Sequence, residues 1–248
     1  IQFTPDLMPS DVLGTTVFNM KTNEFDFHQG PIFADIVLVD EINRAPAKTQ
    51  AALFEVMEER QISIDGITHK MGELYTILAT QNPVEQEGTY KLPEAQLDRF
   101  LMKITMDYPS LEEEVNILER HHTNASLIKL DDIKPAITKE ELLSLRALMN
   151  QVFVDRTLLQ YIALIVQQTR TSKAVYLGAS PRASVAMLQS SKAYALLQGR
   201  DFVTPEDIKF VAPYVLQHRL ILTAEAEMEG YSPVKVTQRL IDKVEVPK

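Results

Sequence analysis

The pattern of apolar and polar positions divides the chain into two parts. Up to about Pro109, short apolar runs alternate with stretches of helical period, which predicts an α/β domain. Ile36–Val39, Tyr75–Thr80 and Leu101–Met106 are predicted strands. Two of them are apolar throughout or nearly so, which is typical of parallel strands covered on both faces. We therefore expect a buried parallel sheet in the first part of the chain.

A helix and two hairpins are predicted between these strands. In Ala47–Glu59 the apolar residues recur at spacings of three and four, which indicates an amphipathic helix, and Pro46 suits its first turn. A hairpin with an Asp65-Gly66 turn is predicted by the flanking segments, 61–64 and 67–69. Segments 16–20 and 24–28 predict a second hairpin. Two inserted hairpins are unusual in simple β-α-β crossover units.

The second part of the chain is predicted to be helical throughout. Four helix starts are marked by capping residues at Thr138, Asp155, Ser180-Pro181 and Thr204-Pro205. We expect three segments: an α/β core over residues 1–122, a linker over 123–136 and a helical domain over 137–248.

Composition excludes several classes of protein. The chain of 248 residues has no cysteine, which removes disulfides, thiol nucleophiles and cysteine metal sites. No apolar run approaches the roughly 20 residues that cross a bilayer, and the first residues have no signal-peptide pattern. The net charge of −9 argues against non-specific nucleic-acid binding. These features favour a cytoplasmic protein that is not bound to a membrane.

The candidate chemistry begins with two acids at a strand end. Asp40 and Glu41 directly follow Ile36–Val39, and the carboxyl ends of parallel strands face the crevice where α/β sheets bind ligands. The first acid can hold Mg²⁺, usually through water, and the second can orient or deprotonate an attacking water. The alternative is that the two acids lie at the end of a strand only because that end is exposed to solvent.

Three further polar residues lie at places suited to phosphate contact. Asn82 follows the second predicted strand, and its amide can bond both a phosphate oxygen and a water. Arg99 precedes Leu101–Met106, and its guanidinium can bind a phosphate. Arg182 opens a helix, where a cation opposes the helix dipole but can face an anion. The alternatives are an Asn-Pro turn, an intramolecular ion pair with an acid such as Asp98, and a solvated arginine.

The order of these residues resembles the MoxR family of AAA+ ATPases. The motifs that carry the resemblance are GPIFAD, DEINRAP, QNPVEQEGTY, LPEAQLDRF and GASPRA. The resemblance covers essentially the whole chain. The resemblance implies a P-loop AAA+ fold: a three-layer α/β core with a parallel sheet and inserted β-hairpins, followed by an all-α lid domain. The hairpins then resemble the helix-2 insert and the pre-sensor-1 hairpin.

The same resemblance implies a role for each candidate residue. Asp40 and Glu41 resemble the Walker B acids, which hold magnesium and water, and Asn82 resembles the sensor-1 residue. Arg99 resembles the arginine finger, and Arg182 the sensor-2 arginine. The implied substrate is ATP with Mg²⁺, in a ring that is typically a hexamer. The implied partners are a protein client and a protein with a von Willebrand factor A domain.

One family motif is missing from the chain. A phosphate-binding loop has the pattern G-x-x-x-x-G-K-[ST], and none of the eight glycines is followed by lysine. In the family that loop precedes the strand that residues 1–4 would form. We therefore expect the phosphate-binding loop to lie upstream of residue 1. We also expect this segment alone to bind little ATP.

Three functions remain open at this point. The first is an ATP-hydrolysing, chaperone-like remodelling enzyme that acts on protein partners. The second is a nucleotide-gated scaffold with little turnover. The third is a nucleic-acid remodelling AAA+ protein, for which the acidic balance is unfavourable and the His69-Lys70 hairpin is the feature to test.

Overall fold

The computed structural model describes residues 1–82, 90, 92–123 and 133–247, which form two compact units, Ile1–Phe100 and Leu101–Lys248. Each unit has its own hydrophobic core. Within the described residues, no helix is long and apolar enough to cross a membrane. The boundaries predicted from sequence, at residues 122 and 137, stay predictions, and most of the predicted linker lies outside the described residues.

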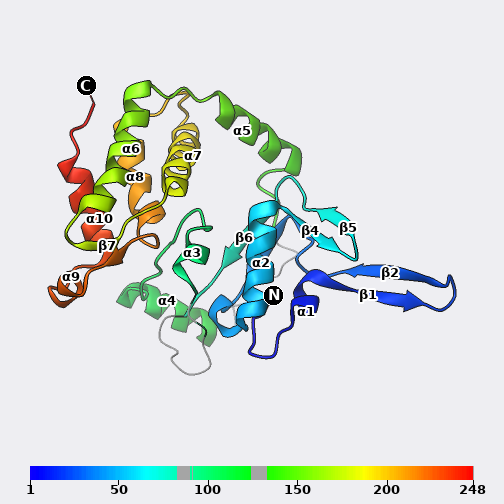
Figure 1. Ribbon diagram of the computed structural model, residues 1–248. Coiled ribbons are helices and arrows are strands. Elements are labelled where there is room, and N and C mark those ends of the chain that lie inside the picture. Colours follow the sequence, from blue (N-terminus) through cyan, green and yellow to red (C-terminus); the bar gives the residue numbers. More distant parts are fainter. Residues whose placement is uncertain (83–89, 91, 124–132, 248) are drawn as a thin grey trace. The chain divides into compact units, whose positions relative to one another are not determined.

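The first unit combines parallel strands, hairpins and one long helix (Figure 1). Its elements are α1 (Pro9–Leu13), β1 (Gly14–Asn19), β2 (Glu24–Gln29), β3 (Ile36–Val39), the 3₁₀ turn η1 (Ile42–Arg44), α2 (Ala47–Glu59), β4 (Gln61–Ile64), β5 (Ile67–Lys70), β6 (Thr76–Ala79) and α3 (Glu94–Leu97).

The parallel strands place the carboxyl ends of two predicted strands side by side. β3 pairs with β6 in register, from Ile36 opposite Thr76 to Val39 opposite Ala79. On the other edge of β3, Gln2 forms a parallel bridge with Asp40. Two of the predicted strands are thus confirmed, and so is the helix over Ala47–Glu59.

The expectation that these strands are buried on both faces is wrong for the described residues. Val37 and Val39 are buried in the core beneath α2, whereas Ile36 and Leu38 are 64% and 54% exposed. Leu78 on β6 is also more than half exposed. The apolar run therefore predicted the strand correctly, but it did not predict how many faces of the strand are buried.

The two predicted hairpins are confirmed. β1 pairs with β2, and β4 pairs with β5, both antiparallel. Asp65 and Gly66 have φ values of 51° and 79°, the left-handed backbone that a two-residue hairpin turn requires. Side chains join the hairpins: the Thr16 hydroxyl donates to the Asp65 carboxylate, and the Phe27 ring lies 4.5 Å from the ring of His69.

The second unit is mainly helical (Figure 1), but the prediction of helices throughout is wrong at Val175–Leu177 and Ile221–Leu222, two short strands that pair antiparallel. Its elements are α4 (Leu111–His122), α5 (Lys139–Gln151), α6 (Arg156–Thr171), β7 (Val175–Leu177), α7 (Pro181–Leu197), α8 (Pro205–Leu216), β8 (Ile221–Leu222), α9 (Ala224–Met228) and α10 (Pro233–Lys243). Thr138, Asp155 and Ser180 are N-cap residues whose side chains accept hydrogen bonds from the first helical turn, as the sequence predicted.

The prediction of a strand over Leu101–Met106 is wrong. This segment has no ladder partner among the described residues, and its backbone bonds instead to the end of α8. Lys103 N donates to the Tyr214 carbonyl (2.9 Å), and Arg219 donates to the Leu101 carbonyl (3.2 Å). The apolar pattern is compatible with extended backbone, but a strand also needs a partner edge, which the pattern does not specify.

A partly buried ion pair lies at the start of α8. Asp207 is 1% exposed, and both of its oxygens accept hydrogen bonds from Arg200, one of them at 2.8 Å. The Thr204 backbone N–H also donates to Asp207, at 2.7 Å. Burial by itself raises the pKa of Asp207, but the bonds from Arg200 and Thr204 outweigh it and hold the pKa below its usual value.

We predict that Asp207→Asn destabilises the helical unit by about 2 to 3 kcal/mol, because it leaves Arg200 without its charged partner. Since the folded-state pKa is lowered, this stabilisation is present above the unfolded pKa of about 3.9 and is lost as the pH falls through the folded pKa. Urea unfolding followed by circular dichroism at neutral and acidic pH measures it. Glu206→Gln at the exposed neighbouring position is the control, and equal losses in both variants would contradict the prediction.

Candidate active site

The backbone around Asp40 is held on both sides. On one edge Asp40 N donates to the Ile1 carbonyl (2.8 Å), and Phe3 N donates to the Asp40 carbonyl (2.9 Å). On the other edge Thr80 N donates to the Val39 carbonyl (2.9 Å). The Asp40 carboxylate therefore lies at a strand end that is hydrogen-bonded to neighbouring backbone on both edges.

The hydroxyl of Thr80 connects the two candidate acids. It donates to Asp40 Oδ1 and accepts from the backbone N–H of Glu41 at 3.0 Å. The sequence interpretation missed this residue. The available signal was register, because Thr80 follows β6 as Asp40 follows β3, and the two strands pair in parallel.

Glu41 has a left-handed backbone, with φ 55° and ψ 50°. This conformation is uncommon for a residue with a side chain and turns the chain sharply away from the strand. Its Oε2 accepts from Gln2 Nε2 at 2.7 Å and pairs with Arg44 Nε at 3.2 Å. Both contacts use Oε2, so neither engages Oε1. Gln2 and Arg44 were not among the sequence candidates.

The turn after Glu41 is tied to α2 by a buried glutamine. Gln50 is 1% exposed, and its Nε2 donates to the carbonyls of Ile42 and Ala45, both at 3.1 Å. Two backbone acceptors of the turn are thereby satisfied inside the core. The acid pair and the first half of α2 consequently form one connected structure.

Asn82 is brought to this turn by Asn43. The buried Asn43 side chain donates from Nδ2 to the Asn82 carbonyl at 3.3 Å, and its own Oδ1 has no hydrogen-bond partner among the described residues. The Asn82 side chain is exposed. Most of the remainder of the QNPVEQEGTY motif, residues 83–89, lies outside the described residues.

Arg99 lies against α2, away from the acid pair. Its Nη1 pairs with Glu58 Oε2 and donates to the Phe54 carbonyl at 3.4 Å. The intramolecular pair weighed from sequence is therefore present, but its acid is Glu58 on α2. A cavity of about 340 Å³ beside this pair is lined by residues of α2 together with Gln96 and Arg99.

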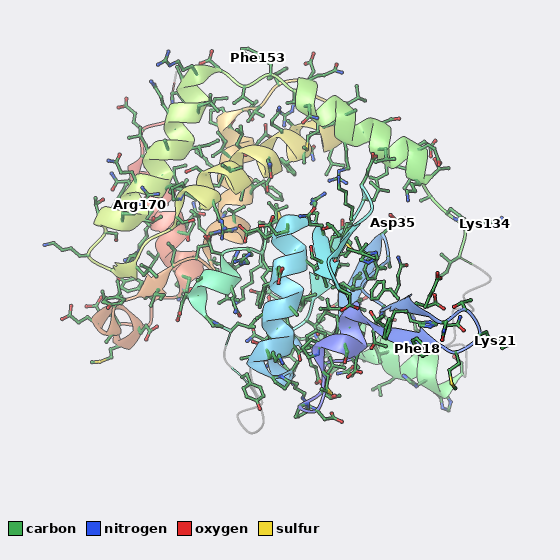
Figure 2. The ribbon with its side chains drawn as sticks, turned by 45° about the vertical axis from the view of Figure 1, so that its right-hand side comes forward. Phe18, Lys21, Asp35, Lys134, Phe153 and Arg170 are labelled. Carbon is green, nitrogen blue, oxygen red and sulfur yellow. The ribbon has the colours of Figure 1, made fainter. Side chains whose placement is uncertain are left out.

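Arg182 belongs to the second unit, in the first turn of α7, where its backbone N–H donates to Ser180 Oγ at 3.1 Å. The loop before it is packed closely on α6. Arg170, labelled in Figure 2, donates from Nε to the Ala179 carbonyl at 2.9 Å. A side chain on Gly178 would meet backbone atoms of Arg170 and Thr169 at 2.8 Å, so this position requires glycine.

The structure thus brings together Asp40, Glu41 and the backbone of Asn82, while Arg99 lies at the far part of α2. The groups gathered at the strand ends are carboxylate and hydroxyl oxygens, the ligand type that Mg²⁺ prefers. The described residues contain no group of three or more His, Cys, Asp or Glu side chains able to hold a metal. The site therefore fits an ion held through one carboxylate and water, and does not resemble an all-protein metal cage.

Comparison with known proteins gives consistent matches over both units. Residues 1–102 match the family model described as "ATPase family associated with various cellular activities (AAA)", and residues 167–242 match the model described as "AAA lid domain". These two matches cover the parallel strands with their acids and about half of the helical unit, from the end of α6 through α10.

Individual relatives align over the entire chain. An uncharacterized protein, YeaC, of Bacillus subtilis is 47% identical over all of this chain and 76% of its own length. Chaperone MoxR1 of Mycobacterium tuberculosis is 43% identical, over all of this chain and 67% of its own length. A crystal structure of a candidate ATPase from Cytophaga hutchinsonii is 40% identical, with a TM-score of 0.89 over all of this chain and 77% of that one.

Proposed function

Because the chain belongs to the MoxR family of AAA+ ATPases, we propose that the full-length protein hydrolyses ATP to remodel protein partners in a chaperone-like manner. The observation that carries the proposal is the acid pair at the end of β3, with the Thr80 hydroxyl between Asp40 Oδ1 and the Glu41 backbone. Phosphoryl transfer to water needs two carboxylates close together. One can hold Mg²⁺ and the other can activate the attacking water.

In this proposal the two acids have different tasks. Asp40 would hold Mg²⁺ through water, and the bound ion would neutralise charge on the phosphates. Its Oδ1 is already occupied by Thr80, which fixes the orientation of the carboxylate. Glu41 would orient the attacking water through Oε1, the oxygen that neither Gln2 nor Arg44 contacts.

The remaining candidates would stabilise charge around the γ-phosphate. The Asn82 amide would bond a phosphate oxygen or the water, from a backbone position set by Asn43. Arg182 at the start of α7 would bind phosphate from the lid, where the helix dipole also favours an anion. Arg99 would act as an arginine finger on the site of a neighbouring subunit, so hydrolysis would depend on assembly into a ring, for which we propose six subunits.

A surface for the protein client is proposed at the hairpins. On β1 and β2, Phe18 faces Phe25 in the same register, with ring centroids 5.1 Å apart. Phe18 is 46% exposed, Phe25 73%, and Met20 at the turn 88%. Figure 2 shows Phe18 and Lys21 in the outer part of this hairpin. A von Willebrand factor A-domain protein is the proposed partner class.

We predict that Glu41→Gln in the full-length protein retains ATP binding and loses hydrolysis by about 100-fold or more, because the amide cannot accept the proton of the water. Nucleotide binding and phosphate release measure the two effects separately. Glu114→Gln on the exposed helix α4 is the control. Unchanged turnover in Glu41→Gln would remove Glu41 from the mechanism, and no turnover in any form despite bound nucleotide would favour a scaffold.

We predict that Arg99→Ala also loses hydrolysis and that mixing it with Glu41→Gln subunits restores part of it. Each variant lacks a different half of the shared site, so mixed rings contain some complete sites. Phosphate release across a range of mixing ratios is the measurement, with co-assembly verified by size. Mixed rings as inactive as either parent would contradict a finger supplied by the neighbour.

A further inference from the structure

Two acceptors on α2 contact the same nitrogen, Nη1, of the Arg99 guanidinium. Glu58 Oε2 and the Phe54 carbonyl both contact Nη1, and neither contact uses Nη2 or Nε. The backbone next to Arg99 is also anchored, because the Phe100 ring packs edge-on against the Phe54 ring at 5.9 Å. The arginine therefore contacts α2 both through the residue next to it and through its guanidinium.

We propose that Glu58 is a positioning residue for Arg99: it clamps one edge of the guanidinium so that the other nitrogens are presented toward the phosphate of a neighbouring subunit. The inference rests on the proposed role of Arg99 as a trans-acting finger. In this inference Glu58 has no contact of its own with the reacting groups and acts through the orientation of Arg99.

Two physical points favour positioning over stabilisation of the fold. The Arg99 and Glu58 side chains are each 31% exposed, and a pair of that exposure contributes little to folding stability. A free arginine, however, loses considerable rotamer entropy when it is fixed on a ligand. A contact that restricts the side chain beforehand lowers this entropy cost. The guanidinium is then already in place when negative charge develops in the transition state.

The helix that provides the clamp is itself fixed to the acid pair. Gln50, eight residues before Glu58, ties α2 to the turn after Glu41, and Phe54 between them is 2% exposed in the core. At 1.5 Å per residue, Gln50 and Glu58 are about 12 Å apart along the helix axis. Glu58 is thus placed by the last turn of a helix whose other face is buried in the core, and not by a loop.

Neighbouring acids offer a matched control. Glu55 and Glu59 line the same cavity as Glu58 and Arg99, and Glu55 lies on the same helix and is exposed. Glu55→Gln removes the same charge from the same surface without touching the clamp. Any general effect of charge near Arg99 should therefore appear equally in Glu55→Gln and Glu58→Gln.

The test compares Glu58→Gln, Glu55→Gln and Arg99→Ala in the full-length protein, with kcat and KM for ATP as readouts. We expect Glu58→Gln to lower kcat by roughly tenfold with KM nearly unchanged, because the amide oxygen can still accept a hydrogen bond but the bond loses its charge assistance. Glu55→Gln should stay within about twofold of the unmodified protein. Mixing Glu58→Gln with Glu41→Gln subunits should restore turnover, because the Glu41→Gln subunits supply correctly held fingers.

The outcomes separate the inference from the proposed function. If Arg99→Ala keeps full turnover, the finger assignment itself is wrong. If Arg99→Ala is inactive but Glu58→Gln behaves as Glu55→Gln does, or is more active than the unmodified protein, the positioning role of Glu58 is overturned. A higher rate would mean that the pair restrains Arg99. A loss of kcat that mixing does not restore would also overturn the inference, because it would indicate a defect within the subunit.

Discussion

The hydrogen bonds of the Thr80 hydroxyl are the constraint on which the proposed site depends. They join the end of β6 to the Asp40 carboxylate and to the Glu41 backbone, across two parallel strands that are already in register. With Asp40 held in this way, the left-handed turn at Glu41 directs the chain into η1, and Gln50 locks that turn onto α2. The orientation of the Asp40 carboxylate therefore follows from strand pairing and one hydroxyl, whereas the Glu41 carboxylate is held by Gln2 and Arg44.

Much of the fold could be predicted from sequence, because it is encoded locally. The helix over Ala47–Glu59, the Asp65-Gly66 turn and the caps of the second unit each depend on residues close together in the chain. The errors concerned long-range partners. Leu101–Met106 has the composition of a strand but bonds to the end of α8, and β3 has one exposed face despite its continuous apolar run.

The candidate site shows the same division between local and long-range information. Asp40, Glu41 and Asn82 could be proposed because each ends a recognisable strand, and the family match covers the segment that contains them. Thr80, Gln2 and Glu58 were not proposed, because their contacts depend on pairing across the sheet or on α2 packing beside Arg99. The roles of Asp40, Glu41, Asn82, Arg99 and Arg182 in catalysis stay predictions.

The central claim is that this site hydrolyses ATP only when a neighbouring subunit completes it. The most direct measurement is phosphate release from the unmodified full-length protein with Mg²⁺ and saturating ATP, over a wide range of protein concentrations. The account predicts a rate per subunit that rises steeply with concentration, reaches a plateau as rings assemble, and vanishes when Mg²⁺ is chelated. A rate per subunit that is constant down to concentrations where the protein is monomeric would contradict it.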